Sequence, residues 1–226
     1  MAIRSRSPSR LSRPDRTGAV VRRELDLAER FDVSRGVARE GIRALEERGL
    51  VSVKHGKGAT VNEPALWSAL DEDVLDIMIA GGASERLAEV LECQRMFEVQ
   101  AAGLAATRAS DADLSQLEEA IAQMSATVDR VDSHRPSAGR YQDARLAFHR
   151  GVVRASGNAT LARLSEPLHR VLAAVGRRAQ PPADRVAAEI EEYREINEKI
   201  AARDAQQASA AMDRHLSAVA RDLLAS

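Results

Sequence analysis

The chain of 226 residues is long enough for one large domain or two small ones, and its 44% hydrophobic and 30% charged content is typical of a globular protein. It has no apolar run of about 18 residues, which excludes a membrane-spanning helix. Its single cysteine excludes an internal disulfide and a cysteine-rich zinc site. Aromatic residues make up only 3%, and Ala, Leu, Arg and Glu are abundant, which favours helices over sheets. The N-terminal arginines are not followed by the apolar segment of a secretory signal, so we expect a cytoplasmic protein without a membrane partner.

Charge is distributed unevenly along the chain. Residues 1–63 contain 14 Lys and Arg against 9 Asp and Glu, whereas residues 64–226 contain 19 against 25. A basic N-terminal region on an acidic remainder favours contact with a polyanion. Because charge is unevenly distributed in many proteins, the charge distribution alone supports DNA binding no more strongly than it supports another role.

The first 63 residues predict an arm followed by a small DNA-binding fold. Residues 1–20 are rich in Arg, Ser and Pro and predict a basic, disordered arm. Residues 21–63 have the pattern of a helix, a turn, a second helix and a strand pair, which together form a winged helix-turn-helix. In chain order, the expected elements are a helix at 25–31, a helix at 34–48 that is capped by Ser34 and ended by Gly49, and strands at 50–53 and 59–61.

Three arginines line one face of the second predicted helix. Arg35, Arg39 and Arg43 are spaced by four residues, so they share a stripe on a helix of about 3.6 residues per turn. Guanidinium groups bind guanine bidentately or grip phosphates, as a helix in the major groove requires. The alternative is a solvated face whose charges pair locally with Glu46 and Glu47.

The loop between the two predicted strands is basic and contains glycine, which permits close approach of its backbone to DNA. We therefore expect it to form the wing of the fold. With two arginines that precede the first helix and the capping serine, the predicted DNA-binding residues are Arg22, Arg23, Ser34, Arg35, Arg39, Arg43, Lys54, His55, Gly56 and Lys57.

Residues 64–226 predict an all-helical domain. Pro64 ends the strand pattern and marks a domain boundary near residues 62–64. Short connections between the helical segments predict a bundle of about six or seven antiparallel neighbours. The helices are expected at 66–80, 84–109, 111–131, 139–156, 158–179, 183–203 and 204–224.

Five polar side chains of this domain stand where the helical pattern places apolar ones. Burial of charged groups is costly unless they are paired, so the set predicts a polar pocket that binds an anion. Each residue taken alone is as readily a satisfied core group, and Glu92 or Glu98 could pair with Arg95. The five residues, predicted to bind an effector, are Arg95, Arg145, His149, Tyr193 and His215.

The segment "LAERFDVSRGVAREGIRALEERGLV", followed by "HGKGATV", resembles the DNA-binding head of GntR-family regulators. The resemblance implies that Arg35 and Arg39 read or clamp operator DNA and that His55 and Gly56 enter the minor groove. The family's arginine near the start of the second helix falls at Leu25 here. The helix and strand that the family has upstream are not recognisable in the predicted arm.

The helical half resembles the FCD ligand-binding domain of the FadR-type branch of that family, over residues 66–222. The resemblance is carried by "ALDEDVLDIM", "LECQRMFEVQAAGLAATRA", "LAFHRGVVRASGN" and "ARDAQQASAAMDRHL". It implies a mainly α protein, with a winged helix-turn-helix before an FCD-like bundle that binds an effector and dimerises. "WSALDEDVL" resembles members that respond to sugar acids such as galactonate or gluconate.

Many FCD domains hold a divalent metal, such as zinc or nickel, with one Asp and three His. His149 and His215 match two of these positions, but Arg145 and Tyr193 stand at the other two, so the site is degenerate and no metal is expected. We expect instead that Arg145 binds a carboxylate directly, together with Arg95, which matches the family's effector-binding arginine. The other three side chains of the set would supply hydrogen bonds.

The sequence therefore predicts a DNA-binding transcription regulator, expected to be a repressor. We expect a homodimer on double-stranded operator DNA of two-fold symmetry, modulated by a small carboxylate such as a sugar acid. One alternative is a constitutive DNA-binding dimer with a decayed pocket. The other is an all-helical enzyme. The sequence argues against this alternative, because it contains no paired carboxylates and no nucleophile with an adjacent base. His169 is at no family position and is interpreted as incidental.

Overall fold

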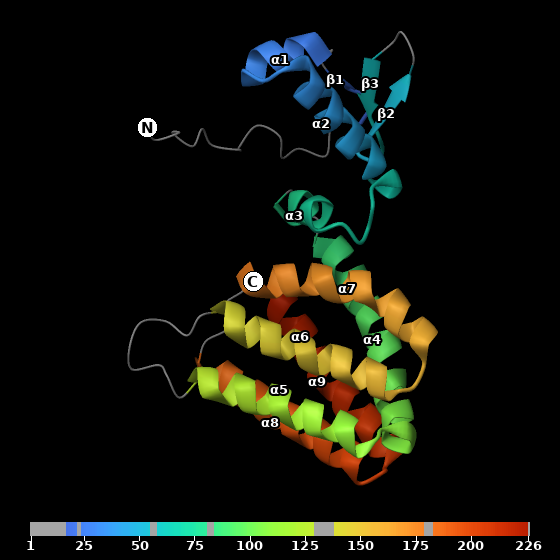
Figure 1. Ribbon diagram of the computed structural model, residues 1–226, viewed down its shortest axis with the longest axis vertical. Helices are drawn as coiled ribbons and strands as arrows, with labels where there is room; N and C mark the ends of the chain where they lie inside the picture. The colour runs from blue at the N-terminus through green and yellow to red at the C-terminus, as the bar shows by residue number, and fades with distance from the viewer. Residues whose placement is uncertain are drawn as a thin grey trace. The chain divides into compact units, whose positions relative to one another are not determined.

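The computed structural model describes residues 17–21, 24–54, 58–80, 84–128, 138–178 and 183–225. The chain forms two compact units that divide after Arg86. Helix α3 (Glu72–Ala80) therefore groups with the N-terminal unit, beyond the boundary that the sequence predicts near residues 62–64. The predicted fold class is confirmed, because the N-terminal unit contains helices and a small sheet and the C-terminal unit is a helical bundle (Figure 1).

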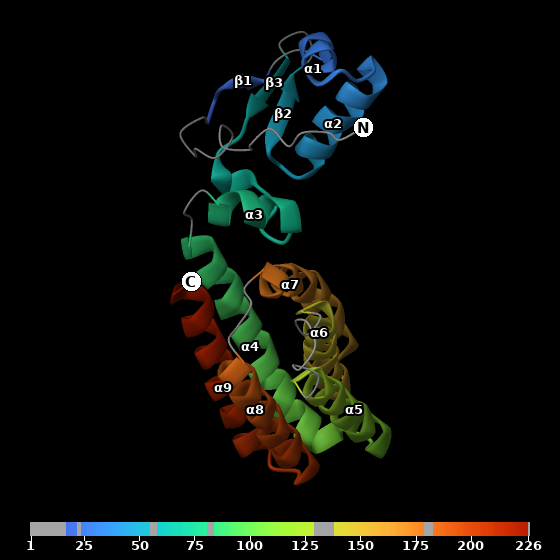
Figure 2. The same cartoon turned by 90° about the vertical axis from the view of Figure 1, so that its left-hand side faces the viewer.

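The N-terminal unit contains the predicted winged helix-turn-helix (Figure 2). The strands lie in the order β1-β3-β2, and both neighbouring pairs are antiparallel, with Val20 opposite Thr60 and Thr60 opposite Ser52. A short 3-10 helix leads from the last strand to α3. Before α3 the elements are β1 (Val20–Val21), α1 (Glu24–Phe31), α2 (Arg35–Glu47), β2 (Val51–Lys54), β3 (Gly58–Val61) and η2 (Pro64–Leu66).

Strand β1 corrects the end of the predicted disordered arm, because residues 17–20 are ordered, whereas residues 1–16 of that arm lie outside the described residues. The backbone N–H of Gly18 donates to the Val61 carbonyl at 2.9 Å, and the Val61 N–H donates to the Ala19 carbonyl at 3.0 Å. Val20 and Val21 then pair with β3. A strand of two residues has no alternating pattern, so its presence depends on the partner strand and is invisible to periodicity.

Helix α2 begins and ends with the signals that the sequence contains. The Ser34 hydroxyl accepts a hydrogen bond from the Val37 backbone N–H at 3.3 Å. At the other end Gly49 has a φ of +72°, and the backbone N–H of Leu50 donates to the Leu45 carbonyl at 2.9 Å, as in a Schellman motif. The chain can thus leave the helix and enter β2 at once.

Replacing Gly49 with alanine should destabilise the N-terminal unit by at least roughly 1–3 kcal/mol, the cost of a strained backbone. The positive φ disfavours a side chain, and a Cβ at this position would lie 2.1 Å from the Leu66 carbonyl oxygen. The matched control is Gly36→Ala, whose Cβ would meet only Ser34 Oγ at 3.7 Å. Thermal unfolding followed by circular dichroism should show a lower melting temperature for Gly49→Ala alone. Equal melting temperatures would contradict this account of the helix end.

The C-terminal unit is an antiparallel bundle whose helices match the predicted segments. Helix α5 packs against α6 and α8, α6 against α7, and α8 against α9. Helices α4 and α9 lie side by side, and the Ser209 hydroxyl of α9 donates to the Val99 carbonyl of α4 at 3.0 Å. The helices are α4 (Ser84–Arg108), α5 (Asp111–Val128), α6 (Ala138–Ala155), α7 (Ala159–Arg178), α8 (Ala183–Ala201) and α9 (Ala205–Ala225).

Small residues and large side chains share the core of this bundle. Four alanines of α4 are completely buried, which permits close packing of neighbouring helices, and bulky side chains such as Phe148 and Met212 fill the space between the other helices. The alanines are Ala101, Ala102, Ala105 and Ala106. Within the described ranges, no helix has the length and apolar character needed to cross a membrane.

Candidate functional site

The three arginines of the predicted stripe lie on the exposed side of α2. Arg35, Arg39 and Arg43 are all exposed, whereas Ile42 is buried in the core of the N-terminal unit. Arg43 Nε lies 3.4 Å from Glu47 Oε1. Within the part of the chain that the structure describes, Arg35 and Arg39 make no hydrogen bond or ion pair. Local pairing therefore accounts for Arg43 but leaves the other two guanidinium groups accessible to a ligand.

The structure describes two of the remaining predicted DNA-binding residues, Ser34 and Lys54. Lys54 is exposed at the end of β2, while Ser34 caps α2. Glu46 Oε1 accepts a hydrogen bond from the Val53 backbone N–H at 3.1 Å, so this carboxylate ties α2 to β2 instead of pairing with an arginine. The predicted positions that lie outside the described residues are Arg22, Arg23, His55, Gly56 and Lys57.

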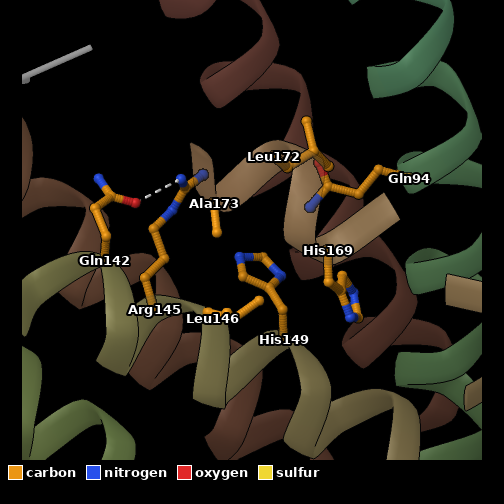
Figure 3. A pocket seen from close by; sticks show the side chains of 8 residues that line it. All are labelled: Gln94, Gln142, Arg145, Leu146, His149, His169, Leu172 and Ala173. Carbon is orange, nitrogen blue, oxygen red and sulfur yellow. Dashed lines mark hydrogen bonds between the residues drawn. The ribbon is translucent and has the colours of Figure 1, made fainter. Parts of the chain in front are cut away.

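A small, partly open pocket with a cavity volume of about 20 Å³ lies in the C-terminal unit between α4, α6 and α7 (Figure 3). His149 stands in its centre, with Arg145 to one side and His169 to the other (Figure 3). Three apolar side chains complete a lining that is otherwise polar. The lining residues are Gln94 from α4, Gln142, Arg145, Leu146 and His149 from α6, and His169, Leu172 and Ala173 from α7.

Glu98 of α4 is the shared partner of three pocket side chains. It is completely buried, and its carboxylate accepts hydrogen bonds from Gln94 Nε2 at 2.9 Å and from His169 Nε2 at 3.0 Å. His149 Nδ1 lies 2.5 Å from its other oxygen. Burial by itself raises the pKa of Glu98, but the charge that the two histidines carry when protonated, and their hydrogen bonds, hold that pKa well below its usual range. The ionised carboxylate thereby fixes both imidazole rings.

The network continues from His149 to Tyr193 on α8. Burial lowers the pKa of His149, although the Glu98 carboxylate opposes this shift. With its Nδ1–H directed at Glu98, a neutral His149 has Nε2 free to accept from the Tyr193 hydroxyl, which lies 3.0 Å away. Burial, followed by the neighbouring Glu189 carboxylate, raises the pKa of Tyr193 well above its ordinary value. Tyr193 therefore stays protonated and can act as the donor.

Arg145 and Glu189 form a buried ion pair between α6 and α8. Arg145 Nε donates to Glu189 Oε1 at 2.8 Å and lies 3.1 Å from the Tyr193 hydroxyl, and its Nη1 donates to Gln142 Oε1 at 3.4 Å. Only 12% of the Arg145 side chain and 6% of the Glu189 side chain are exposed. Burial raises the pKa of Glu189, but the charge of Arg145, together with smaller effects of His215, Tyr141 and Arg185, more than offsets this and lowers the pKa to about 2. The cation predicted to bind an anion already has a carboxylate partner.

His215 packs beside Tyr193 and His149 but is not among the residues that line the pocket. Its Nδ1 lies 2.7 Å from Glu192 Oε2, and its ring centroid is 4.5 Å from that of Tyr193 and 5.5 Å from that of His149. The structure thus brings four of the five predicted effector residues together. Of these four, Arg145 and His149 line the pocket, whereas Tyr193 and His215 do not.

Arg95 is the predicted effector residue that the structure places elsewhere. Its side chain is 54% exposed, and its Nε and Nη2 bind the two carboxylate oxygens of Asp213 on α9 at 2.5 and 3.0 Å. The preceding residue, Gln94, lines the pocket instead. Consecutive residues on a helix differ by about 100°, so an error of one residue in the helix phase exchanges an inward position for an outward one.

Sequence reasoning also missed five polar residues of the pocket and its network, namely Gln94, Glu98, Gln142, His169 and Glu189. Glu98 was considered only as a partner for Arg95, and His169 was interpreted as incidental, although the structure pairs these two with each other. The spacing of Gln94 and Glu98 carried a usable signal, because residues four apart lie on the same face of a helix. That signal identifies a polar face but not the histidines on other helices that it meets.

The family resemblance implies a metal, and the donor set does not fit one. Arg145 stands at the position of the acidic ligand and pairs with Glu189. The Tyr193 hydroxyl stands at a histidine position and is hydrogen-bonded to His149 Nε2. A divalent cation there would lie beside a guanidinium that repels it. Among the residues that the structure describes, no three His, Cys, Asp or Glu side chains are grouped to hold a metal ion.

Two family matches cover the two units in order. Residues 16–61 match the family described as bacterial regulatory proteins, gntR family, and residues 89–218 match the FCD domain. The chain is 30% identical to the galactonate operon transcriptional repressor of Escherichia coli over 149 residues, which cover 66% of this chain and 62% of that protein. It is 29% identical to the HTH-type transcriptional regulator LutR of Bacillus subtilis over 198 residues, which cover 85% of this chain and 86% of that protein.

A solved structure supports the same fold. The Streptococcus agalactiae GntR structure superposes with a TM-score of 0.54 and 24% identity, covering 91% of this chain and 90% of that one. The matched family and the relatives are transcriptional regulators and not enzymes. The chain therefore belongs to the GntR family of bacterial transcriptional regulators, in the FadR-type branch that joins a DNA-binding head to an FCD domain.

Proposed function

We propose that the protein is a homodimeric repressor that releases double-stranded operator DNA when a small organic acid occupies the pocket of its FCD domain. The observation that carries the effector part is the guanidinium of Arg145, which lines the pocket while its Nη2 makes no hydrogen bond with any described residue. A guanidinium with open donors is the group that proteins use to bind carboxylates. As a regulator of chromosomal DNA, the protein would act in the cytoplasm.

The proposal of a dimer rests on the contact surface and symmetry that specific DNA recognition requires. A single winged head offers a small contact surface, and two heads related by a two-fold axis match the symmetry of a palindromic site. Exposed Arg35 and Arg39 on each α2 would supply the base or phosphate contacts. Occupancy of the pocket would change the arrangement of the two heads, a coupling typically worth about 1–3 kcal/mol.

A hydroxylated acid fits the chemistry of the pocket lining. Gln94 and Gln142 provide amide donors and acceptors, and His149 and His169 add imidazole groups beside the guanidinium. Such a lining suits the hydroxyl groups of a sugar acid, and a relative at 30% identity is named as the repressor of a galactonate operon. We therefore propose a sugar acid of the galactonate type as the effector class.

The ion pair between Arg145 and Glu189 favours a second candidate. Because Glu189 already neutralises the guanidinium, the pocket could have lost its ligand, which would leave a DNA-binding dimer that is always active. Ligand binding by the purified protein distinguishes the two.

Isothermal titration calorimetry with D-galactonate, D-gluconate and L-lactate tests the effector. We expect Arg145→Ala to weaken binding of the best carboxylate by more than about tenfold, the value of one charge-assisted contact. The matched control is Arg95→Ala, which should bind like the wild type because Arg95 pairs with Asp213 outside the pocket. Arg145→Ala leaves the buried Glu189 carboxylate without its cationic partner. The double variant Arg145→Gln, Glu189→Gln therefore serves as a second test, in which a neutral pair of polar side chains replaces the ion pair.

The outcomes separate the parts of the proposal. Unchanged affinity in Arg145→Ala and in the double variant would show that the guanidinium is not the carboxylate anchor. If the wild type binds none of the three acids, while it still shifts DNA from upstream of its own gene in a gel, the protein acts without an acid of this class. Retained operator binding at saturating effector would remove the repressor mechanism.

A further inference from the structure

Glu189 is surrounded by more donors than it uses. Its carboxylate accepts from Arg145 Nε at Oε1, the oxygen that also lies 3.1 Å from the Tyr193 hydroxyl. Tyr141 on α6 is buried, yet its hydroxyl makes no hydrogen bond of ordinary geometry with any described residue. Arg185 Nη2 on α8 is equally buried and equally without a partner in the described part of the chain. Both lie near the Glu189 carboxylate: a distorted hydrogen bond from Tyr141 and the charge of Arg185 each help to lower the pKa of Glu189.

Unpaired buried donors are unfavourable, and native proteins retain few of them. Tyr141 is not needed to hold Glu189 in this arrangement, because Arg145 already does so. Glu189 is its strongest electrostatic neighbour, and after burial itself this carboxylate is the main cause of the raised pKa of Tyr141. The two unpaired donors thus mark a second set of partners for the same carboxylate.

On its pocket side, Arg145 would bind a second carboxylate when an acidic ligand is present. A ligand carboxylate that reaches Nη1 and Nη2 would place two carboxylates on one buried guanidinium. Such a cluster has an excess negative charge in a poorly hydrated site, which is strongly unfavourable. Either the ligand is excluded or Glu189 must exchange Arg145 for another donor.

We propose that a carboxylate ligand displaces Glu189 from Arg145, and that Glu189 then accepts hydrogen bonds from Tyr141 and Arg185. This inference rests on the proposed function, since it requires an acidic ligand in the pocket. Both positions of Glu189 are satisfied by donors already present, so the ion pair becomes an element with two discrete states.

The exchange connects the pocket to α8 and α9. Arg185 Nη1 donates to Glu192 at 3.0 Å, and its Nε donates to Asp222 on α9 at 2.5 Å. Glu192 is also the partner of His215 on α9. Recruitment of Arg185 by Glu189 would therefore disturb contacts between these two helices. Ligand occupancy sensed on α6 would be transmitted to a helix pair that does not line the pocket.

The test is Tyr141→Phe in the full-length protein, titrated calorimetrically with D-galactonate. The hydroxyl makes no hydrogen bond of ordinary geometry in the ligand-free state, so the melting temperature without ligand should change little. In the bound state the variant lacks a donor to a charged carboxylate, so the dissociation constant should increase by about tenfold. Loss of affinity without loss of stability is a signature that a merely structural tyrosine would not produce.

Glu189→Gln is the second variant and should change both quantities in the opposite sense. It removes the charge that competes with the ligand, so the ligand-free protein should melt lower while D-galactonate binds several-fold more tightly. Galactitol, which has the hydroxyl groups without the carboxylate, should be insensitive to both substitutions. Equal dissociation constants for wild type and Tyr141→Phe would overturn the exchange while leaving the proposed effector intact. A wild-type protein that binds none of D-galactonate, D-gluconate and L-lactate would reject the effector class, and the exchange with it.

Discussion

Arg39→Ala should weaken specific operator binding by more than about tenfold and leave the melting temperature unchanged. Arg39 is exposed in the first half of α2 and, among the residues that the structure describes, has no internal partner to lose. A bidentate contact from arginine to guanine discriminates against other bases by about 1–3 kcal/mol. Fluorescence anisotropy at one fixed salt concentration, with labelled DNA from upstream of the protein's own gene, measures the loss.

The matched control is Arg43→Ala on the same stripe. Arg43 lies one turn further from the start of the helix and pairs with Glu47 at 3.4 Å, and recognition helices read bases mainly through their N-terminal residues. We expect about a threefold loss or less, since Arg43 lies further from the end of the helix that reads the bases. A footprint that persists in Arg39→Ala, or an equal loss in both variants, would mean that α2 does not read the sequence through Arg39.

Local patterns were sufficient for most helices and for the head. Helix α2 lies within a residue of its predicted ends because Ser34 and Gly49 are strong boundary signals in the sequence itself. The bundle helices match because each alternates apolar and polar residues at helical spacing and is separated from the next by a short break. These features depend on residues a few positions apart, which a single sequence contains in full.

The features that escaped prediction depend on contacts between distant segments. Strand β1 forms because β3, about 40 residues later, offers it a free edge. The histidine partners of Glu98 come from two other helices, and Glu189, which pairs with Arg145, lies 44 residues from it. Helical periodicity identifies an inward polar residue but carries no information on which helix will face it. The misplacement of Arg95 is different in kind, since it arose from a phase error of a single position within one helix.

Removal of the charge that is buried in the bundle should have the largest effect on stability. Glu98→Ala should lower the free energy of unfolding of the C-terminal unit by about 3–5 kcal/mol, as is typical when one partner of a buried charged network is removed. Gln94, His149 and His169 would each lose the acceptor of a buried hydrogen bond. For a domain of this size the loss corresponds to a decrease of roughly 6–20 °C in melting temperature, measurable by differential scanning calorimetry.

Two further variants identify which property of Glu98 matters. Glu92→Ala, on the exposed side of the same helix, should change stability by less than about 0.5 kcal/mol, as surface substitutions usually do. Glu98→Gln keeps the size and one acceptor oxygen but directs an amide donor at groups that are themselves donors, so it should fall between the two. If Glu98→Gln instead has the same melting temperature as the wild type, Glu98 acts only as a hydrogen-bond acceptor, and its negative charge does not stabilise the two histidines. If Glu98→Ala melts with the wild type, the network does not hold α4 against α6 and α7.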